Sequence, residues 1–262
     1  MDYLFDPDVI HECALAGLGK SKPAMFDAVA DAMEARYPGR IDRSQPWIYS
    51  IAGGAMIQMK LYYASIFEYL MIWGTPIGSE GHSGRHAVAF WDTVLDGETW
   101  YYAEGQFEKR VHKPGDRIFV GPGQARGMSF TKGVWAVEYA RGPLPLSLPF
   151  GLADELLSTL DFSTAAQTLG IYMSLIAHHL RQPLPGVSLP GSVARKAAAA
   201  LLGAVGPGLT RLVRPAAATD EIPRGDAVGT SRASRARPAP RLTVAGGDAA
   251  SGTRRARSSR EE

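Results

Sequence analysis

The chain has 262 residues, of which 45% are hydrophobic and 9% aromatic, and this composition indicates a globular protein with a sizeable core rather than a disordered chain. Its single cysteine, Cys13, excludes an internal disulfide framework and a zinc site built from cysteines. The formal net charge of +2 conceals a division, because residues 183–262 carry 13 Lys and Arg against 6 Asp and Glu, whereas residues 1–182 carry 15 against 20.

Residues 1–46 are predicted to form an N-terminal helical segment. Apolar residues recur there at helical spacing and form one face: Phe26, Val29, Ala30, Met33 and Tyr37. Ser21 is expected to cap this helix, Pro23 suits its first turn, and Pro38-Gly39 ends it.

Residues 47–142 consist of short segments rich in Tyr, Ile, Val, Phe and Trp, separated by turns that contain glycine or proline. Strand-sized segments at roughly ten-residue spacing are typical of an antiparallel sandwich or small barrel. In the last segment, Trp135 and Tyr139 alternate with small residues and with Glu138, so the carboxyl group lies on the opposite strand face.

Residues 143–182 are predicted to form a pair of helices. The first has a stripe of leucines, namely Leu152, Leu156, Leu157 and Leu160. Asp154 and Glu155 are expected in its first turn, where the helix dipole favours acids. The second helix, from about Ser163 to Leu180, is more apolar than a solvent-facing helix needs to be.

Residues 183–262 form a tail rich in Ala, Pro and Arg, which we predict to be mostly disordered because it lacks periodicity. A short apolar stretch interrupts it at 193–214. Its unpatterned basic charge is expected to aid solubility, so no nucleic-acid partner is predicted.

The strand-rich region places four acids among apolar residues: Glu68, Glu80, Asp92 and Glu138. A charged Glu138 in the middle of a strand is costly to bury unless it is paired or protonated. The alternative is a carboxylate on a solvated strand face. Asp92 is either a second site acid or an acid at a strand end or turn, and Glu68 is expected to be a buried structural hydrogen-bonding group.

Two observations raise the question of a metal site. His82 and His86 lie four residues apart, and residues 114–123 resemble half of a cupin signature. Metal-binding cupins have two histidines spaced two apart, and here Arg126 lies near the position of the third. An arginine repels a cation, so we predict neither a metal nor a cofactor. The absence of a glycine-rich phosphate loop argues against nucleotide binding.

Several separate motifs resemble those of one family, the fungal-type C-8 sterol isomerases and the related sigma non-opioid intracellular receptor. The motifs lie at Phe5–Pro7, Ala52–Met56, Ala64–Leu70, Gly74–Gly84, Lys113–Asp116, Val137–Gly142 and Leu148–Phe162. The most distinctive are the EGHSG sequence and the EYARG and FGLAD blocks.

The resemblance implies an α+β fold, with a cupin-like antiparallel β-barrel that encloses an apolar ligand and two C-terminal helices that face a membrane. It also implies that Glu138 and Asp92 form an acidic pair, that Tyr69 holds Glu138, and that Glu80 is an acid typical of the isomerase branch. A homotrimer is a further implication. The remaining candidates for binding or supporting the substrate are His82, Glu68, Trp135 and Trp91.

The resemblance implies a sterol isomerase, in which a neutral carboxylic acid in a dry pocket protonates an alkene and its carboxylate then stabilises the cation. Glu138 is the expected central group, and Asp92 and Glu80 compete for the partner role. The alternative is a receptor-like protein that binds sterols or hydrophobic amines without catalysis. Glu80 and the lack of a receptor-type anchor favour the enzyme.

We expect the chain to bind sterol and the membrane surface. No window reaches the roughly 20 consecutive apolar residues that a spanning helix needs, and we expect neither a cleaved signal nor an N-terminal anchor. Attachment is expected through the helices around 150–180, with the apolar stretch at 193–214 as a further candidate, at the endoplasmic reticulum membrane if the organism is eukaryotic.

Overall fold

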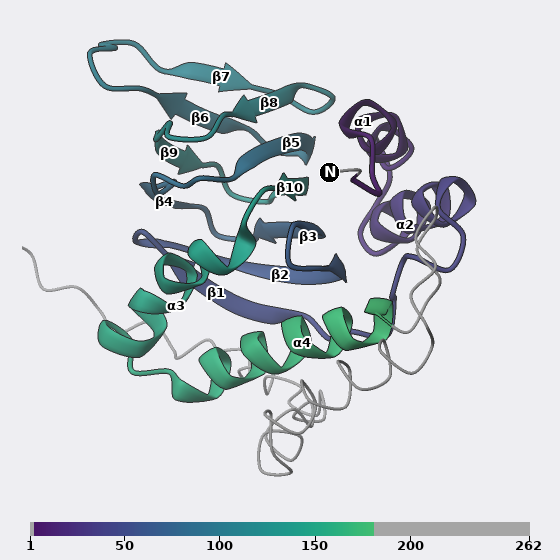
Figure 1. Ribbon diagram of the computed structural model, residues 1–262. Helices are drawn as coiled ribbons and strands as arrows, with labels where there is room; N and C mark the ends of the chain where they lie inside the picture. Colours follow the sequence, from purple (N-terminus) through teal and green to yellow (C-terminus); the bar gives the residue numbers. More distant parts are fainter. Residues whose placement is uncertain (1–2, 181–262) are drawn as a thin grey trace, which may run out of the picture. The chain divides into compact units, whose positions relative to one another are not determined.

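The computed structural model describes residues 3–180 (Figure 1). They lie within one compact unit, Met1–Ala217, and the second unit, Ala218–Glu262, falls outside the described residues. The predicted tail and its apolar stretch at 193–214 also fall outside them.

Helices precede and follow a block of strands. The helices are α1 (Pro7–Leu15), α2 (Ala24–Arg36), the short 3₁₀ helix η1 (Leu144–Leu146), α3 (Leu148–Leu157) and α4 (Phe162–Leu180). The strands are β1 (Ile48–Ala52), β2 (Ala55–Ala64), β3 (Glu68–Thr75), β4 (Ser79–His82), β5 (Ala89–Asp96), β6 (Thr99–Tyr102), β7 (Arg110–His112), β8 (Arg117–Val120), β9 (Gly127–Phe130) and β10 (Val134–Arg141).

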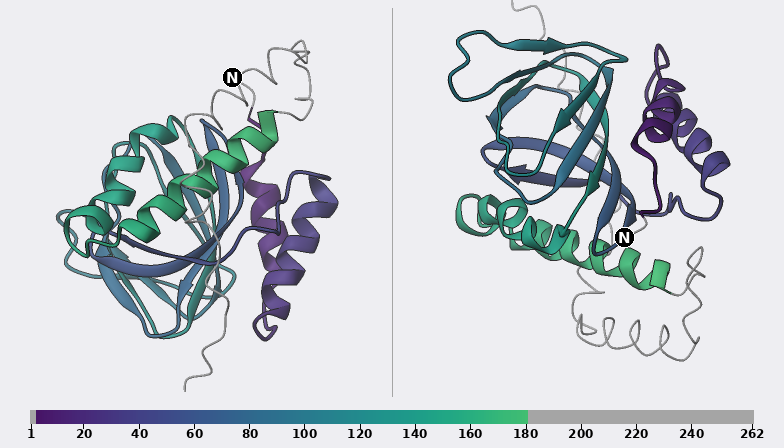
Figure 2. Two further views of the ribbon diagram at one scale, coloured as in Figure 1. Left: turned by 90° about the horizontal axis from the view of Figure 1, so that it is seen from below. Right: turned by 45° about the horizontal axis from the view of Figure 1, so that its top comes forward.

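The helices α1 and α2 pack side by side (Figure 2). The apolar face predicted for α2 is confirmed in its centre, where Val29, Ala30 and Met33 are buried. The predicted cap is wrong, because the Ser21 side chain makes no capping bond and its backbone carbonyl instead accepts from the Met25 N–H at 2.8 Å. The helix therefore depends on packing rather than on a side-chain cap.

The strands pair antiparallel in two sheets, in the orders β1-β2-β3-β10-β5-β8 and β4-β9-β6-β7. The α+β class and the antiparallel pairing are as predicted, but residues 3–180 do not form one closed barrel. The reason lies at the edge strand β1, which α3 and α4 cover in place of a further strand (Figure 1).

Successive side chains in each strand of the six-stranded sheet point to opposite faces. One face packs against α1 and α2, and includes Leu70, Trp135 and Tyr139. The other packs toward the four-stranded sheet and α4, and includes Met71 and Ala136. This alternation decides which of the predicted site residues can meet.

The boundary predicted for the first C-terminal helix is wrong. The 3₁₀ helix η1 leads directly into α3, which has a proline in its first turn and begins at Leu148. Asp154 and Glu155 therefore lie in its second half, not its first turn. Of the predicted leucine stripe only Leu152 is buried, whereas the side chains of Leu157 and Leu160 are 82% and 62% exposed.

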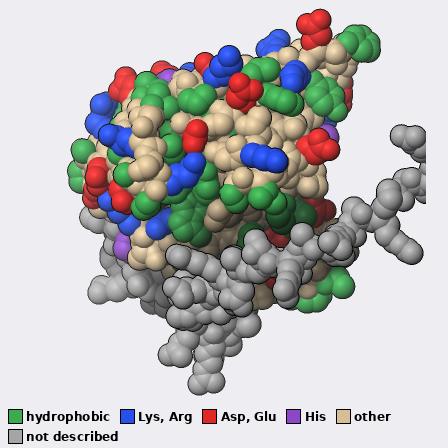
Figure 3. Space-filling model, turned by 180° about the vertical axis from the view of Figure 1, so that it is seen from behind, with side chains coloured by type: hydrophobic (Ala, Val, Ile, Leu, Met, Phe, Trp, Pro, Cys, Tyr) green, Lys and Arg blue, Asp and Glu red, His purple; other side chains and the backbone are tan. Residues whose placement is uncertain are grey.

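The second C-terminal helix is confirmed as α4, which buries one face against β1 and β2. No helix in the described part of the chain combines the length and the apolar character that crossing a bilayer requires. On the face of the molecule seen in Figure 3, acidic and basic side chains are interspersed, so their fields largely cancel there.

Candidate functional site

A cavity of about 230 Å³ lies between the two sheets, and residues of η1, α3 and α4 close one end of it. Most of its lining is apolar, contributed for example by Met59, Met71 and Phe130. Two carboxyl groups interrupt this lining, those of Asp92 and Glu138.

The two acids face each other on neighbouring strands. Glu138 on β10 is directly opposite Asp92 on β5, and their carboxyl groups hydrogen-bond to each other. On the other side of β10, strand β3 supplies a donor to each acid. The Tyr69 hydroxyl donates to Glu138 Oε1, and the Trp73 indole N–H donates to Asp92 Oδ1 at 3.1 Å.

Burial in the apolar lining raises the pKa of both acids, because it disfavours the charged form. The pKa of Asp92 rises to about 6. That of Glu138 rises well above its ordinary value, through burial first and then through the charge of Asp92. Their mutual hydrogen bond lowers the pKa of Asp92 and raises that of Glu138, so the shared proton resides on Glu138. Near neutral pH the pair is therefore one neutral acid beside one carboxylate.

Such a pair can perform two kinds of chemistry. The neutral acid can protonate a weak base in a site without water, and the neighbouring carboxylate can stabilise a positive charge that forms there. It can also bind a ligand that already carries a positive charge, such as a hydrophobic ammonium ion.

Three sequence candidates lie on the opposite face of the sheet. Trp91 and Trp135 pack against the helical segment, and neither lines the cavity. Glu68 is buried there as a hydrogen-bond acceptor for the Leu4 and Phe5 N–H groups, at 2.9 and 3.2 Å, and for a tyrosine hydroxyl. The alternation of β3, β5 and β10 separates these residues from the acid pair.

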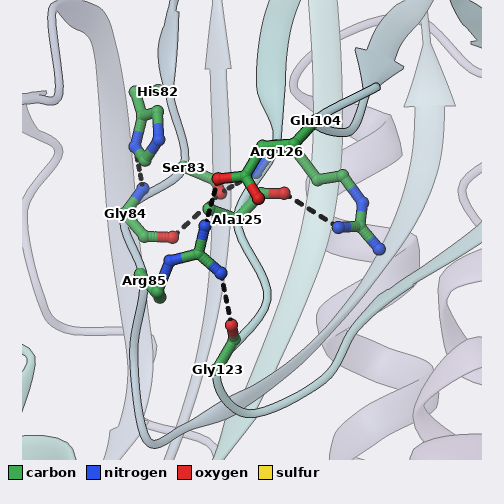
Figure 4. A network of polar contacts seen from close by, with 8 residues as sticks. All are labelled: His82, Ser83, Gly84, Arg85, Glu104, Gly123, Ala125 and Arg126. Atoms are coloured by element: carbon green, nitrogen blue, oxygen red, sulfur yellow. Dashed lines mark hydrogen bonds and ion pairs between the residues drawn. The ribbon is translucent and has the colours of Figure 1, made fainter. Parts of the chain in front are cut away.

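Two further candidates, Glu80 and His82, lie on β4 with exposed side chains and do not line the cavity. The Nδ1 atom of His82 accepts a hydrogen bond from the Gly84 N–H at 2.9 Å, and Ser83 Oγ accepts one from the Arg126 N–H at 2.9 Å (Figure 4). This network ties the loop after β4 to the loop before β9. The structure thus joins Asp92, Glu138 and Tyr69, and leaves Glu80 and His82 outside the cavity.

Sequence reasoning missed several aromatic residues of the cavity, among them Trp73 and Tyr101. Trp73 could have been found, since it shares the strand face of Tyr69 at a spacing of four residues. Tyr101 lies on the facing sheet, and no local pattern shows which strands face each other across a cavity.

Metal ligation finds no support in the geometry. Within residues 3–180 no three His, Cys, Asp or Glu side chains gather as a metal site would require. His86 lines the cavity, but its Nε2 atom is hydrogen-bonded to the Ser83 carbonyl at 3.0 Å.

Comparison with known proteins gives a consistent family. The family model described as "ERG2 and Sigma1 receptor like protein" matches residues 1–183. The C-8 sterol isomerase of Pyricularia oryzae is 40% identical over 171 residues, which cover 63% of this chain and 77% of that protein. The sigma non-opioid intracellular receptor 1 of Gallus gallus is 37% identical over 172 residues, which cover 65% and 78% respectively.

Among solved structures, an RmlC-like cupin from Shewanella frigidimarina matches 40% of this chain and 94% of its own, with 15% identity and a TM-score of 0.31. A likeness this distant does not inform the function.

Proposed function

Because this chain belongs to the family that joins the C-8 sterol isomerases to the sigma non-opioid intracellular receptors, we propose that it is a sterol isomerase. It would move a ring double bond from the delta-8 to the delta-7 position in sterol biosynthesis of the ergosterol type. The observation that carries this proposal is the Asp92–Glu138 pair, whose carboxyl groups face each other in an apolar cavity that raises the pKa of both.

The reaction begins with proton transfer from the neutral Glu138 to carbon 9 of the substrate. The electron pair of the 8,9 double bond forms the new C–H bond, and carbon 8 becomes cationic. The carboxyl pair, which has lost its proton, attracts this cation strongly because the cavity has a low dielectric constant. A proton then leaves carbon 7 for the pair, and the 7,8 double bond forms. The pair acts as a unit and ends with the proton count it had at the start.

Tyr69 and Trp73 serve this chemistry by holding the two carboxyl groups in place through their hydrogen bonds. Asp92 is favoured over Glu80 as the partner of Glu138, because Asp92 contacts Glu138 and lines the cavity whereas Glu80 is exposed. His82 would support the loop after β4.

The second candidate function is a receptor-like protein that binds sterols or hydrophobic amines without catalysis. The avian sigma receptor is almost as similar to this chain as the fungal isomerase is, at 37% against 40% identity. The same acid pair would bind the ammonium group, since that group resembles the cationic intermediate.

Association with a membrane surface is part of the proposal, at the endoplasmic reticulum membrane if the organism is eukaryotic. Leu157, Leu160 and Phe162 are exposed where α3 meets α4, and α3 also lines the cavity. A sterol is poorly soluble in water, so entry from the bilayer past these side chains is the direct route. Sedimentation with phospholipid vesicles tests this, and undiminished binding of the doubly substituted Leu157→Ser, Leu160→Ser chain would contradict it.

The homotrimer that the resemblance implies is likewise a proposal, which light scattering tests.

The deciding experiment incubates the purified chain with a delta-8 sterol in deuterated buffer and identifies the product by mass spectrometry. We expect a delta-7 sterol with one deuterium at carbon 9. Glu138→Gln should lower the rate roughly 1,000-fold, whereas Glu80→Gln, the matched exposed carboxyl group, should change it less than about twofold. A folded native chain that binds hydrophobic amines but gives no product would overturn the isomerase and favour the receptor-like function.

A further inference from the structure

Tyr101 lines the cavity from the four-stranded sheet, whereas the acid pair lines it from the six-stranded sheet. Along β6 the burial alternates, so Thr99 and Tyr101 are buried while Tyr102 is exposed. Of the residues that the strands of this sheet contribute to the lining, Tyr101, Met128 and Phe130, only Tyr101 has a hydrogen-bonding side chain.

The Tyr101 hydroxyl makes no hydrogen bond to any residue of the described chain. Burial raises its pKa well above the ordinary value, and the charges of Asp92 and Glu138 raise it further. The hydroxyl is thus a neutral donor that interacts electrostatically with both acids of the pair. A donor that lines the cavity and has no partner in the described chain can bond to a ligand that supplies an acceptor.

The ring of Tyr101 is held by its surroundings. The His112 ring packs against it edge-on, with 5.9 Å between the ring centroids and an interplanar angle of 70°. A donor on a ring fixed in this way loses little further freedom when a ligand binds.

Other polar groups of the cavity differ from Tyr101 in position or in partners. The Ser147 and Thr168 hydroxyls also lack a partner among the described residues, but they belong to the helical end of the cavity and not to the sheet that faces the acid pair. The Tyr172 hydroxyl donates to the Ser65 carbonyl at 2.7 Å, and the Ser83 hydroxyl donates to the Gly84 carbonyl at 3.1 Å. Ser50 lies on β1, three strands from β10 in the sheet order, which is roughly 14 Å along the sheet.

We propose that Tyr101 recognises the substrate by donating a hydrogen bond to the hydroxyl oxygen on ring A of a 3-hydroxy sterol whose reacting double bond lies on the Asp92–Glu138 pair. This inference rests on the proposed function. In such a sterol the carbon that bears the hydroxyl is four bonds from carbon 9, so one bound molecule reaches both the acid pair and a donor on the facing wall. The contact would set the position of the ring system along the cavity and would discriminate against sterols without the hydroxyl group.

The test is a binding cycle on the full chain with two probes, a steroid amine with a ring nitrogen and a 3-hydroxyl group, and the same amine without the hydroxyl. For the native protein, removing the ligand hydroxyl should weaken binding about 10-fold. For Tyr101→Phe, which keeps the ring, the two amines should bind within about twofold of each other. Tyr102→Phe, the exposed neighbour, should behave as the native protein does.

A 10-fold preference that persists in Tyr101→Phe, or a native protein without preference, would overturn the role of Tyr101 while leaving the isomerase intact. If neither amine binds the native chain, the acid pair is not a ligand site, and the proposed function fails together with this inference. Because binding is measured rather than turnover, the cycle also applies to a receptor-like protein.

Discussion

Each face of the six-stranded sheet buries a glutamate, and the two glutamates differ in their partners. Glu68, 5% exposed, accepts three hydrogen bonds, from the Leu4 and Phe5 N–H groups and from the Tyr139 hydroxyl. Glu138 has one tyrosine donor and shares its proton with a second acid. The residue type is the same, and Glu138 is the more accessible of the two because it borders the cavity. The number of donors, together with this access, separates a structural carboxylate from a reactive one.

The two glutamates also differ in the space around their carboxyl groups. On the side of Glu68 the aromatic rings pack closely. The distance is 4.8 Å between the centroids of Phe5 and Tyr63 and also between those of Phe5 and Tyr37. On the side of Glu138 the sheets leave a cavity. A carboxyl group with few donors beside an apolar cavity can protonate a ligand, whereas a fully bonded carboxylate among packed rings can only hold structure.

The largest effect on stability is expected for Glu68→Gln, which tests whether Glu68 is purely structural. The amide nitrogen would face donors, and the charge-assisted bonds to Leu4 and Phe5 would be lost, so the free energy of unfolding should fall by about 3 kcal/mol. Turnover per folded molecule should stay within about twofold of the native value. Urea unfolding and product formation measure the two quantities.

Glu138→Gln is the matched control and should show the reverse, with turnover lost and stability kept or raised. If Glu68→Gln abolished turnover in a folded protein, the two faces would not divide structure from chemistry, and Glu68 would belong to the site.

The sequence allowed part of this division to be predicted. Alternation in the last strand predicted that Glu138 points away from Trp135 and Tyr139, and the motifs singled out Asp92 and Tyr69. Trp135, which is also a predicted site residue, lies instead on the face that packs against the helices, as its alternation with Glu138 along the strand requires.

Other features depend on contacts that no local pattern contains. Tyr101 lines the same cavity as the acid pair only because two separate sheets face each other. Glu155 was predicted in the first turn of its helix. It lies instead in the second half of α3 and is buried, because η1 leads into an earlier helix start and α3 then covers the edge strand β1. The predicted closed barrel is wrong at the same edge. No local sequence pattern shows whether a helix or a further strand covers β1.

Glu155 sharpens the comparison, because it is 1% exposed and has few donors but does not line the cavity. Neither of its carboxyl oxygens reaches hydrogen-bond geometry with a described residue. Burial raises its pKa to about 7, the nearby Ile51 N–H offsets this in part, and the charge of Asp161 adds to it. No other charged side chain comes from β1 or η1. Glu155 therefore tests whether few donors alone mark a reactive group.

Because the folded pKa of Glu155 lies above the unfolded value of 4.5, the folded state binds the proton more tightly. Stability should therefore fall as the pH rises from about 4.5 to 7 and remain low above that range. Glu155→Gln stays neutral and should be more stable than the native chain by about 3 kcal/mol at pH 8, with the difference vanishing near pH 4.5. Thermal or urea unfolding at the two pH values measures this. An equal change at both pH values would contradict the proton linkage, and a loss of turnover would make few donors alone the mark of function.

The smallest effect concerns the single donor that Glu138 has from Tyr69. That hydrogen bond lowers the pKa of Glu138, so Tyr69→Phe should raise it. The protonated pair is the reactive form, and kcat/KM must fall as the pH rises through its upper pKa. Tyr69→Phe should move this alkaline limb to higher pH by about one unit and lower kcat about 10-fold, because Glu138 is less well held. Tyr172→Phe, which also removes a cavity hydroxyl, should leave the limb in place. A limb that moved to lower pH in Tyr69→Phe would mean that Tyr69 stabilises the neutral form of Glu138. The number of donors would then not explain why Glu68 and Glu138 differ.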